Sequence, residues 1–333
     1  MRKFLPRRLL LILALLGTPA LADINMVIDK YIIANTAAFT QSTANLAISA
    51  QKDCTPKGMK AAFHHSFDAW VRISHIRFGP LESSGEVLAT VFWPDKKGKI
   101  PKILFKMIKD ENPVVYDAKL FAGYSVATRG FFALEQLLYD DKFSNFSADS
   151  YSCDLVRAIT KDLSRIALQT HAGWLGGYAD LLRNSGAEGN QTFLTEKEGP
   201  QVLFTSLLGG LEYIHRQQLG RPLHKFQHRR PKRAEAWRSN RSLRNVIISL
   251  ESLREMATIL ADGHAWESME LFDSTIAYAK KLDDDVFARI QENSANFQLG
   301  SLQQMVGATH EMVNAELGAH LGVVAGFNAL DGD

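Results

Sequence analysis

The 333-residue sequence has only two cysteines, and it lacks every paired-cysteine motif. Without Cys-x-x-Cys-His it has no attachment site for a c-type haem, and without paired Cys-x-x-Cys it has no cysteine-based structural zinc site. It also lacks the Gly-x-Ser-x-Gly, P-loop and dinucleotide fingerprints. Nothing in the sequence therefore supports a serine hydrolase or an enzyme driven by nucleotides.

Long apolar runs are missing except at the N-terminus. Residues 1–22 carry four cations, then the run LLLILALL, and end on Ala20-Leu21-Ala22. This order is typical of a secretory signal peptide, so we expect cleavage after Ala22 and a periplasmic protein, an uncleaved N-terminal anchor being the alternative. No later segment approaches the roughly 20 apolar residues that a membrane-spanning helix needs, so no span is predicted in the mature chain.

The net charge gives no general argument for nucleic-acid binding, and no nucleic-acid partner is predicted. Loss of the signal peptide removes four cations from the formal +2 and leaves −2. Positive charge remains concentrated in residues 221–244, where nine lysines or arginines accompany one acid. Such a cluster can hold an anionic ligand or the acidic face of a partner, with Arg238, Arg241 and Arg244 as candidates. The alternative is a solvated loop between helices.

The two cysteines, Cys54 and Cys153, suit an exported protein. In an oxidising compartment an even cysteine count favours one disulfide. Closing so long a loop would contribute about 4–5 kcal/mol in the chain-entropy model. The sequence does not show whether the two residues meet in space.

The hydrophobic periodicity is helical along most of the chain. In the segment that starts at Thr55, this residue offers an N-cap, Pro56 suits the first turn, and apolar residues from Phe63 to Ile73 recur at helical spacing. Similar patterns predict helices over about 26–51, 119–139, 150–184, 200–219, 240–262, 266–293 and 299–321. The predicted fold class is all-α, with two packed helical bundles.

The length favours two domains, because about 310 mature residues exceed a usual single core. Residues 184–200 combine glycines, polar residues and a helix-ending start, and mark the expected boundary. After the signal peptide we therefore expect bundles over 23–190 and 191–333. Within the first, residues 80–116 mix β-branched and aromatic residues with prolines, which predicts an irregular insertion of short helices or a hairpin.

Three stretches carry a resemblance to a known family: FDAWVRISHIRFGPL at 67–81, GFFALEQLLY at 130–139, and the terminal LGVVAGFNALDGD at 321–333. On these the chain resembles the imelysin family, a group of insulin-cleaving membrane proteases and iron-regulated periplasmic proteins, over its mature length. The resemblance implies two helical bundles, a link to iron or haem acquisition, and a metal or peptidase site near the domain interface.

The family signature at that site is Gly-x-His-x-x-Glu, and this chain departs from it. Gly130 and Glu135 match, whereas Phe132 stands where the family has histidine. Positions three apart share a helix face, so a histidine and a glutamate with this spacing can bind one cation. Phenylalanine has no lone pair to donate. Glu135 is the one candidate catalytic residue, and its alternative role is structural, in an ion pair or a helix cap.

Other histidines and carboxylates have spacings typical of metal ligands. For a divalent metal such as iron, the candidate ligands that would join Glu135 across the interface are His64, His65, His171 and His264. Pairs three apart also occur at Glu212/His215 and His264/Glu267, and the segment 309–320 holds His310, Glu311, Glu316 and His320. In a helical protein with ten histidines such pairs also arise by chance. Adjacent His64 and His65 project about 100° apart on a helix and do not face one ion.

Two functions follow from this sequence. The first is a periplasmic binding or accessory protein in iron or haem acquisition, working with uptake components and without a full catalytic metal site. The second is a metal-dependent peptidase acting on a peptide ligand, with its missing ligand supplied from elsewhere in the domain interface. The second needs an ion that activates water, and the expected histidine is absent.

Overall fold

The computed structural model describes residues 24–224 and 229–325. The predicted signal peptide, and the part of the C-terminal resemblance from Gly326 to Asp333, lie outside the described residues. Within them the protein is all-α, as predicted, and contains no strand. No described helix combines the length and apolar character needed to cross a membrane.

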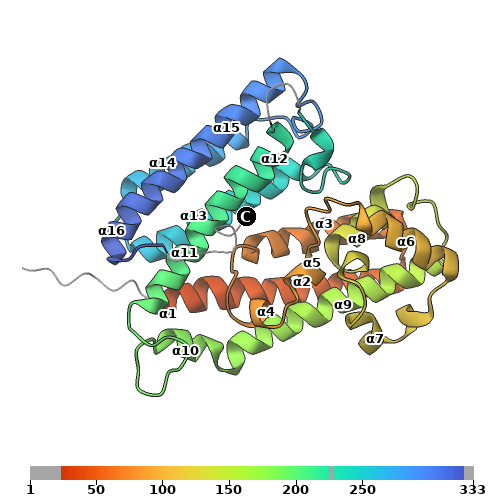
Figure 1. Cartoon of the computed structure of the whole chain (residues 1–333), viewed down its shortest axis with the longest axis horizontal. Helices are drawn as coiled ribbons and strands as arrows, with labels where there is room; N and C mark the ends of the chain where they lie inside the picture. The colour runs from red at the N-terminus through yellow and green to blue at the C-terminus, as the bar shows by residue number, and fades with distance from the viewer. Residues whose placement is uncertain (1–23, 225–228, 326–333) are drawn as a thin grey trace, which may run out of the picture.

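The helices of the N-terminal half form one group, seen in red to yellow-green in Figure 1. Its longest members are α2 (Ala34–Lys52), α3 (Pro56–Ile73) and α9 (Tyr151–Gly173), and α2 packs against both others. Short helical pieces extend these rods, namely α1 (Ile24–Met26) with π-helical η1 (Val27–Ile33) before α2, and π-helical η4 (Trp174–Tyr178) with α10 (Ala179–Arg183) after α9. The group presents α3 to the second half of the chain.

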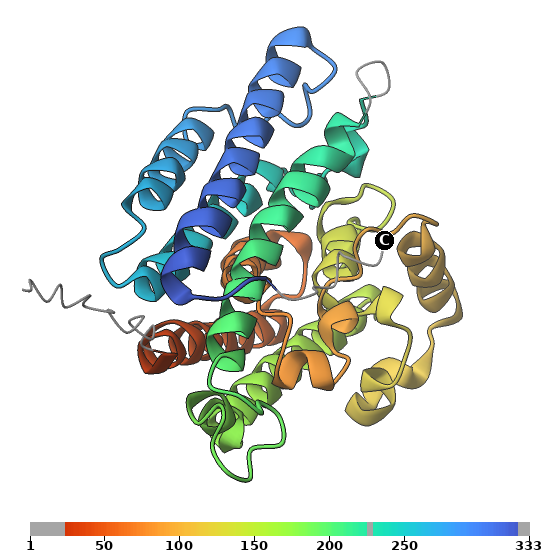
Figure 2. The same ribbon diagram turned by 60° about the vertical axis from the view of Figure 1, so that its left-hand side comes forward.

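The C-terminal half forms a second group, with α11 (Glu198–Glu212) beside α15 (Asn293–Met312), as Figure 2 shows. Between them in sequence come π-helical η5 (Tyr213–Leu219), α12 (Gly220–Leu223), the 3₁₀ turn η6 (Pro231–Arg233), α13 (Ser242–Ala261) and α14 (Trp266–Ala279). The last helical elements of the described residues are η7 (Val313–Leu317) and α16 (Gly318–Leu321). Helix α14 packs against both α13, which precedes it in the sequence, and α15, which follows it.

The predicted insertion at 80–116 contains helices joined by irregular segments, so the alternative of short helices is confirmed and the hairpin is wrong. It contains α4 (Pro80–Ser83), α5 (Val87–Thr90), α6 (Lys99–Asp110) and the 3₁₀ turn η2 (Pro113–Tyr116). Helix α6 forms because Ile100, Leu104 and Met107 recur at helical spacing and are buried together. Apolar periodicity therefore outweighs the β-branched composition of this stretch.

Two of the predicted helices are shorter than expected. The segment 119–139 is divided into α7 (Ala118–Ala122), the 3₁₀ turn η3 (Val126–Thr128) and α8 (Gly130–Tyr139), and α14 ends at Ala279 instead of near residue 293. In the first case α7 ends at its C-cap residue Gly123, and the side chain of Ser125 accepts a hydrogen bond from the N–H of Ala127 that starts the next turn. Local caps therefore override a continuous apolar pattern.

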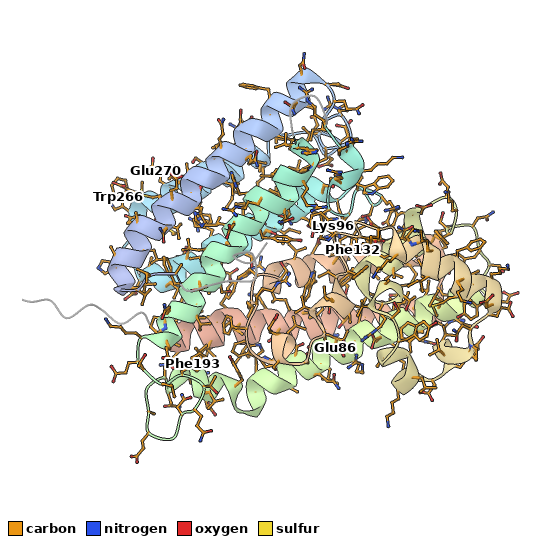
Figure 3. The ribbon with its side chains drawn as sticks, viewed as in Figure 1. Glu86, Lys96, Phe132, Phe193, Trp266 and Glu270 are labelled. Carbon is orange, nitrogen blue, oxygen red and sulfur yellow. A yellow bond between two sulfur atoms is a disulfide. The ribbon has the colours of Figure 1, made fainter. Side chains whose placement is uncertain are left out.

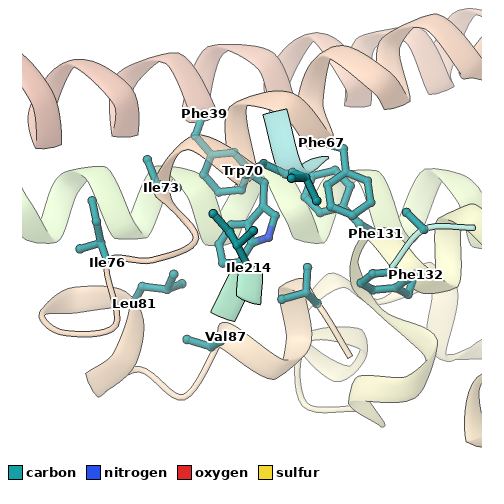
Figure 4. Packing of buried hydrophobic residues seen from close by; sticks show 14 of the residues in the cluster. Phe39, Phe67, Trp70, Ile73, Ile76, Leu81, Val87, Phe131, Phe132 and Ile214 are labelled. Atoms are coloured by element: carbon teal, nitrogen blue, oxygen red, sulfur yellow. The ribbon is translucent and has the colours of Figure 1, made fainter. Parts of the chain in front are cut away.

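A single hydrophobic core runs through both groups. Figure 4 shows Ile214 of η5 among Phe67 and Trp70 of α3 and Phe131 of α8. Helix α3 also packs directly on α13. The segment 184–197 between α10 and α11 is irregular, but the division into two domains stays a prediction because the core is continuous across it.

The predicted disulfide is present. Cys54 follows α2, Cys153 lies in the first turn of α9, and the two Cα atoms are 5.3 Å apart. Both residues are fully buried. The bond joins two long helices of the N-terminal group across 99 residues of sequence.

Candidate functional site

The motif helix α8 begins at Gly130, and this position needs glycine. Its φ is +73°, in the left-handed region, and an added Cβ would lie 2.2 Å from the carbonyl oxygen of Thr90 and 2.3 Å from that of Ala89. The glycine therefore lets α8 start directly against the end of α5. This close approach explains on structural grounds why Gly130 matches the glycine of the family motif, and a catalytic role is not needed to explain it.

Phe132 occupies the motif's histidine position and packs as a core side chain. It is 5% exposed, its ring meets Phe67 edge to face at 5.7 Å, and it stacks on Trp93 at 6.4 Å between centroids. Figure 4 shows Phe132 beside the ring of Phe131 on the same helix. The position thus contributes apolar packing where a ligand would need a lone pair.

Glu135 is buried and its carboxylate is hydrogen-bonded. One oxygen, Oε1, accepts bonds from the backbone N–H of Ser239 at 3.0 Å and from its hydroxyl at 2.7 Å. Burial raises the pKa of Glu135, while the Ser239 bonds and the charges of Arg238 and Arg241 oppose the shift. The carboxylate therefore holds the chain before α13 against α8.

The motif residues do not fit a divalent metal ion. Glu135 is engaged by Ser239, and Phe132 contributes only carbon atoms. Within residues 24–224 and 229–325, no three histidine, cysteine, aspartate or glutamate side chains lie close enough together to hold a metal. The motif therefore does not provide a set of metal ligands for a metal-dependent reaction.

Of the four histidine candidates, only His64 approaches the motif helix. Its Nε2 lies 2.8 Å from the hydroxyl of Tyr139, the last residue of α8, and its Nδ1 lies 3.1 Å from Arg241. Burial and the positive charges of Arg241 and Arg244 lower the pKa of His64 to about 4. The imidazole is therefore neutral at pH 7 and completes a polar network.

The other three histidine candidates lie elsewhere. His65 is exposed on α3, and His171 on α9 has its Nδ1 2.9 Å from the hydroxyl of Thr36. His264, in the loop after α13, stacks on His320 at 4.2 Å between centroids. The structure does not gather these residues around Glu135.

Two carboxylates of the predicted metal-type spacings, Glu212 and Glu316, have other partners. Glu212 forms an ion pair with Arg216 one turn later at 3.0 Å. Glu316 accepts hydrogen bonds from the backbone and hydroxyl of Ser268, which caps the first turn of α14. These two residues act as an ion-pair partner and a helix cap in this structure.

The three arginines predicted to bind an anion or partner all face carboxylates of the N-terminal group. Arg238 pairs with Asp140 at 2.8 Å, and both Arg241 and Arg244 pair with Asp68, at 2.7 and 2.5 Å. The alternative of a solvated loop is wrong for residues 234–242, which hold six buried side chains. Ion pairs with residues far away in the sequence bury this stretch. Its local composition does not indicate that burial.

Glu235, the one acid of the basic segment, is also buried. It accepts hydrogen bonds from the hydroxyl of Tyr213 at 2.9 Å and from the amides of Gln218 and Asn245 at 2.6 and 2.9 Å. Burial and the Glu235 charge raise the pKa of Tyr213 well above its usual value. Glu235 thus ties the basic segment to η5 and α13.

A cavity of about 610 Å³ lies between the two helical groups. Its wall comes from four stretches: the end of α3 with residues 74–78, residues 87–96, α11 with η5 and α12, and α13. Its cationic side chains are Arg77, Lys96 and Arg221, and Figure 3 labels Lys96 in the region where the groups meet. No sequence pattern marks Arg77 or Lys96 as a site residue, and the only signal for Arg221 is its place at the start of the basic segment.

We expect acid to destabilise the cavity wall at His75. Its ring hydrogen-bonds Tyr31, and burial with the charges of Arg77 and Arg72 lowers its pKa to about 3. In the unfolded chain His75 takes up a proton near pH 6.5, whereas in the folded chain it stays neutral down to about pH 3. The contribution of His75 to the unfolding free energy therefore has its full value above pH 6.5 and decreases as the pH falls towards 3. Between pH 7.5 and 5 the loss is about 2 kcal/mol.

Urea unfolding at both pH values checks this expectation. The fall in unfolding free energy should be smaller by that amount in a His75→Gln variant, whereas His65→Gln, at an exposed position of α3, should behave as wild type. Equal pH dependence in wild type and His75→Gln would contradict the assignment.

Restoring the motif histidine is expected to cost stability without creating a metal site. Phe132→His places an imidazole in an aromatic core that offers no partner, at a cost of about 1–3 kcal/mol. Thermal melts with and without zinc check this result. A melting temperature that zinc restores in Phe132→His but not in Phe132→His/Glu135→Gln would show instead that Glu135 can leave Ser239 and bind the ion.

The fold and its cavity define a class of all-α protein in which two helical groups share one core and enclose a cavity between them. The sequence profile of the imelysin family, the peptidase M75 group, matches residues 30–312. The chain belongs to the imelysin family.

Two solved structures share this fold. An imelysin-like protein from Psychrobacter arcticum has a TM-score of 0.76 and 20% identity, over 91% of this chain and 96% of that one. A "putative iron-regulated protein A precursor" from Parabacteroides distasonis has a TM-score of 0.68 and 12% identity, over 89% and 96%. No curated protein sequence matches this chain significantly. At these identities the two structures establish the fold alone.

Proposed function

We propose that this chain is a periplasmic binding or accessory protein in iron or haem acquisition. The proposal rests mainly on the roles of the two motif residues. Phe132 packs in the hydrophobic core, and the Glu135 carboxylate accepts structural hydrogen bonds from Ser239. The motif then joins the two helical groups, and the cavity between them supplies the binding surface. Family membership and the iron-regulated fold relative support the link to iron. The Cys54–Cys153 disulfide and the signal-like N-terminus support the periplasm.

Growth of a deletion strain under iron limitation tests this function. We expect slower growth when iron is chelated or supplied only as haem, with full restoration by wild-type chain and by Glu135→Gln, because the variant can keep one acceptor oxygen for Ser239. Unchanged growth of the deletion strain under both conditions would refute a role in iron or haem acquisition.

The same variant separates binding from proteolysis. A metallopeptidase would show cleavage of unfolded protein that is lost on chelation and in Glu135→Gln. We expect no such activity in purified protein, because the motif has no ligand set. Chelator-sensitive cleavage that depends on Glu135 would replace the proposal with the peptidase alternative.

A further inference from the structure

The walls of the cavity are mainly apolar. Aliphatic side chains come from both helical groups, and aromatic rings come from the segment that follows α3 and from residues 91–94. They include Val71, Phe78, Val91, Trp93, Val202 and Leu253. A cavity of about 610 Å³ falls within the range of pockets that enclose small organic molecules. Its walls therefore suit a ligand with an apolar body.

The charged side chains of the cavity are all positive. Arg77, Lys96 and Arg221 line it, and no carboxylate does. None of the three is within ion-pair distance of an acidic side chain in the described ranges, in contrast to Arg238, Arg241 and Arg244, which all face carboxylates. The cavity therefore carries positive charge that the protein itself does not neutralise there.

Arg77, Arg221 and Tyr213 all line the cavity. The positive charges of Arg77 and Arg221 both lower the pKa of the Tyr213 hydroxyl, against the larger effect of burial. The Arg221 guanidinium lies 5.4 Å above the ring of Trp93, and its Nε is buried without a hydrogen-bond partner in the described chain. A partly buried guanidinium of this kind loses hydration and gains from an anion placed beside it.

We propose that this cavity binds an amphiphilic organic anion, with its carboxylate or phosphate head at Arg221 and Arg77 and its apolar body against Trp93, Val202 and Leu253. Lys96 is exposed at the rim and adds attraction as the anion enters. The inference rests on the proposed binding role and names the class of ligand. It assigns no part to the motif residues of α8.

Matched fluorescent probes test the inference on the purified mature chain. The anion 1-anilinonaphthalene-8-sulfonate and its neutral counterpart N-phenyl-1-naphthylamine share an apolar body and differ in charge. We expect the anion to bind one site per chain and more tightly than the neutral probe. The affinity for the anion should fall about tenfold in Arg221→Gln, as for loss of a charged hydrogen bond, while the neutral probe is unaffected.

Two further variants control the experiment. Arg216→Gln, on η5 five residues before Arg221 and outside the cavity, should leave both affinities unchanged. Val202→Trp should fill the cavity and weaken both probes, with thermal melts confirming that each variant is folded. Equal affinity for the two probes, or anion binding that survives Arg221→Gln/Arg77→Gln unchanged, would overturn the proposal.

Competition then identifies the head group. Displacement of the bound anion by decanoate supports a carboxylate ligand, displacement by decyl phosphate supports a phosphate ligand, and displacement by neither overturns the assigned class. These results are independent of the growth experiment. If the chain binds the anion but its deletion does not affect iron-limited growth, the anion site is supported and the iron function is refuted. If deletion slows growth but the chain does not bind the anion, only the anion site is refuted.

Discussion

Replacement of Arg241 by methionine is expected to lower the unfolding free energy by about 3–5 kcal/mol, as when one partner of a buried ion pair is removed. Arg241 is 1% exposed, pairs with Asp68 of α3 at 2.7 Å, and donates to Asn245 at 2.8 Å. Its guanidinium also lies 4.3 Å above the ring of Phe67. The variant leaves Asp68 and Asn245 with fewer partners where the two helical groups meet.

Urea unfolding of the Arg241→Met and Arg244→Met variants measures this effect against a matched control. Arg244 pairs with the same carboxylate, but its side chain is 52% exposed, so its loss should cost less than about 1 kcal/mol. Similar losses in the two variants would show that burial of Arg241 does not set its contribution.

Removal of the disulfide is expected to have an effect of similar size. The bond between Cys54 and Cys153 closes a loop of 99 residues, which restricts the unfolded chain and corresponds to about 4–5 kcal/mol in the chain-entropy model. A Cys54→Ala/Cys153→Ala variant should therefore unfold at a much lower urea concentration than the oxidised wild type.

Reduction of the wild type provides an independent comparison. Oxidised and reduced wild-type protein should differ by nearly as much as wild type and the double variant, and reductant should not affect the double variant. A difference below about 1 kcal/mol between the oxidised and reduced forms would mean that the unfolded chain is already restricted in this region, or that the folded state is strained.

Much of the fold could be predicted because it depends on local pattern. Apolar spacing placed the helix from Pro56 to Ile73 and the long helix from Tyr151, and the even cysteine count indicated the disulfide. Predictions failed where a short polar signal competes with that pattern, as at Ser125, whose side chain caps a new turn inside the expected 119–139 helix. Caps worth about 1 kcal/mol are enough to decide helix ends.

The candidate site was only partly predictable. The sequence showed that Phe132 removes a ligand from the motif, but it left open whether Glu135 is catalytic or structural. The acceptor role became visible only when Ser239, 104 residues away, was placed against it. In the same way, the basic segment predicted a surface for anions, whereas folding directs Arg238, Arg241 and Arg244 to carboxylates and leaves Arg221 at the cavity.

The sequence by itself determined the all-α class, most helices and the loss of the motif histidine, because helical periodicity and residue chemistry are local properties. Only the tertiary structure decided which polar groups meet: Glu135 with Ser239, Asp68 with two arginines, and three cations around one cavity. Those partners come from segments far apart in the chain, and they are selected by the packing of the two helical groups around a common core, which no local spacing encodes.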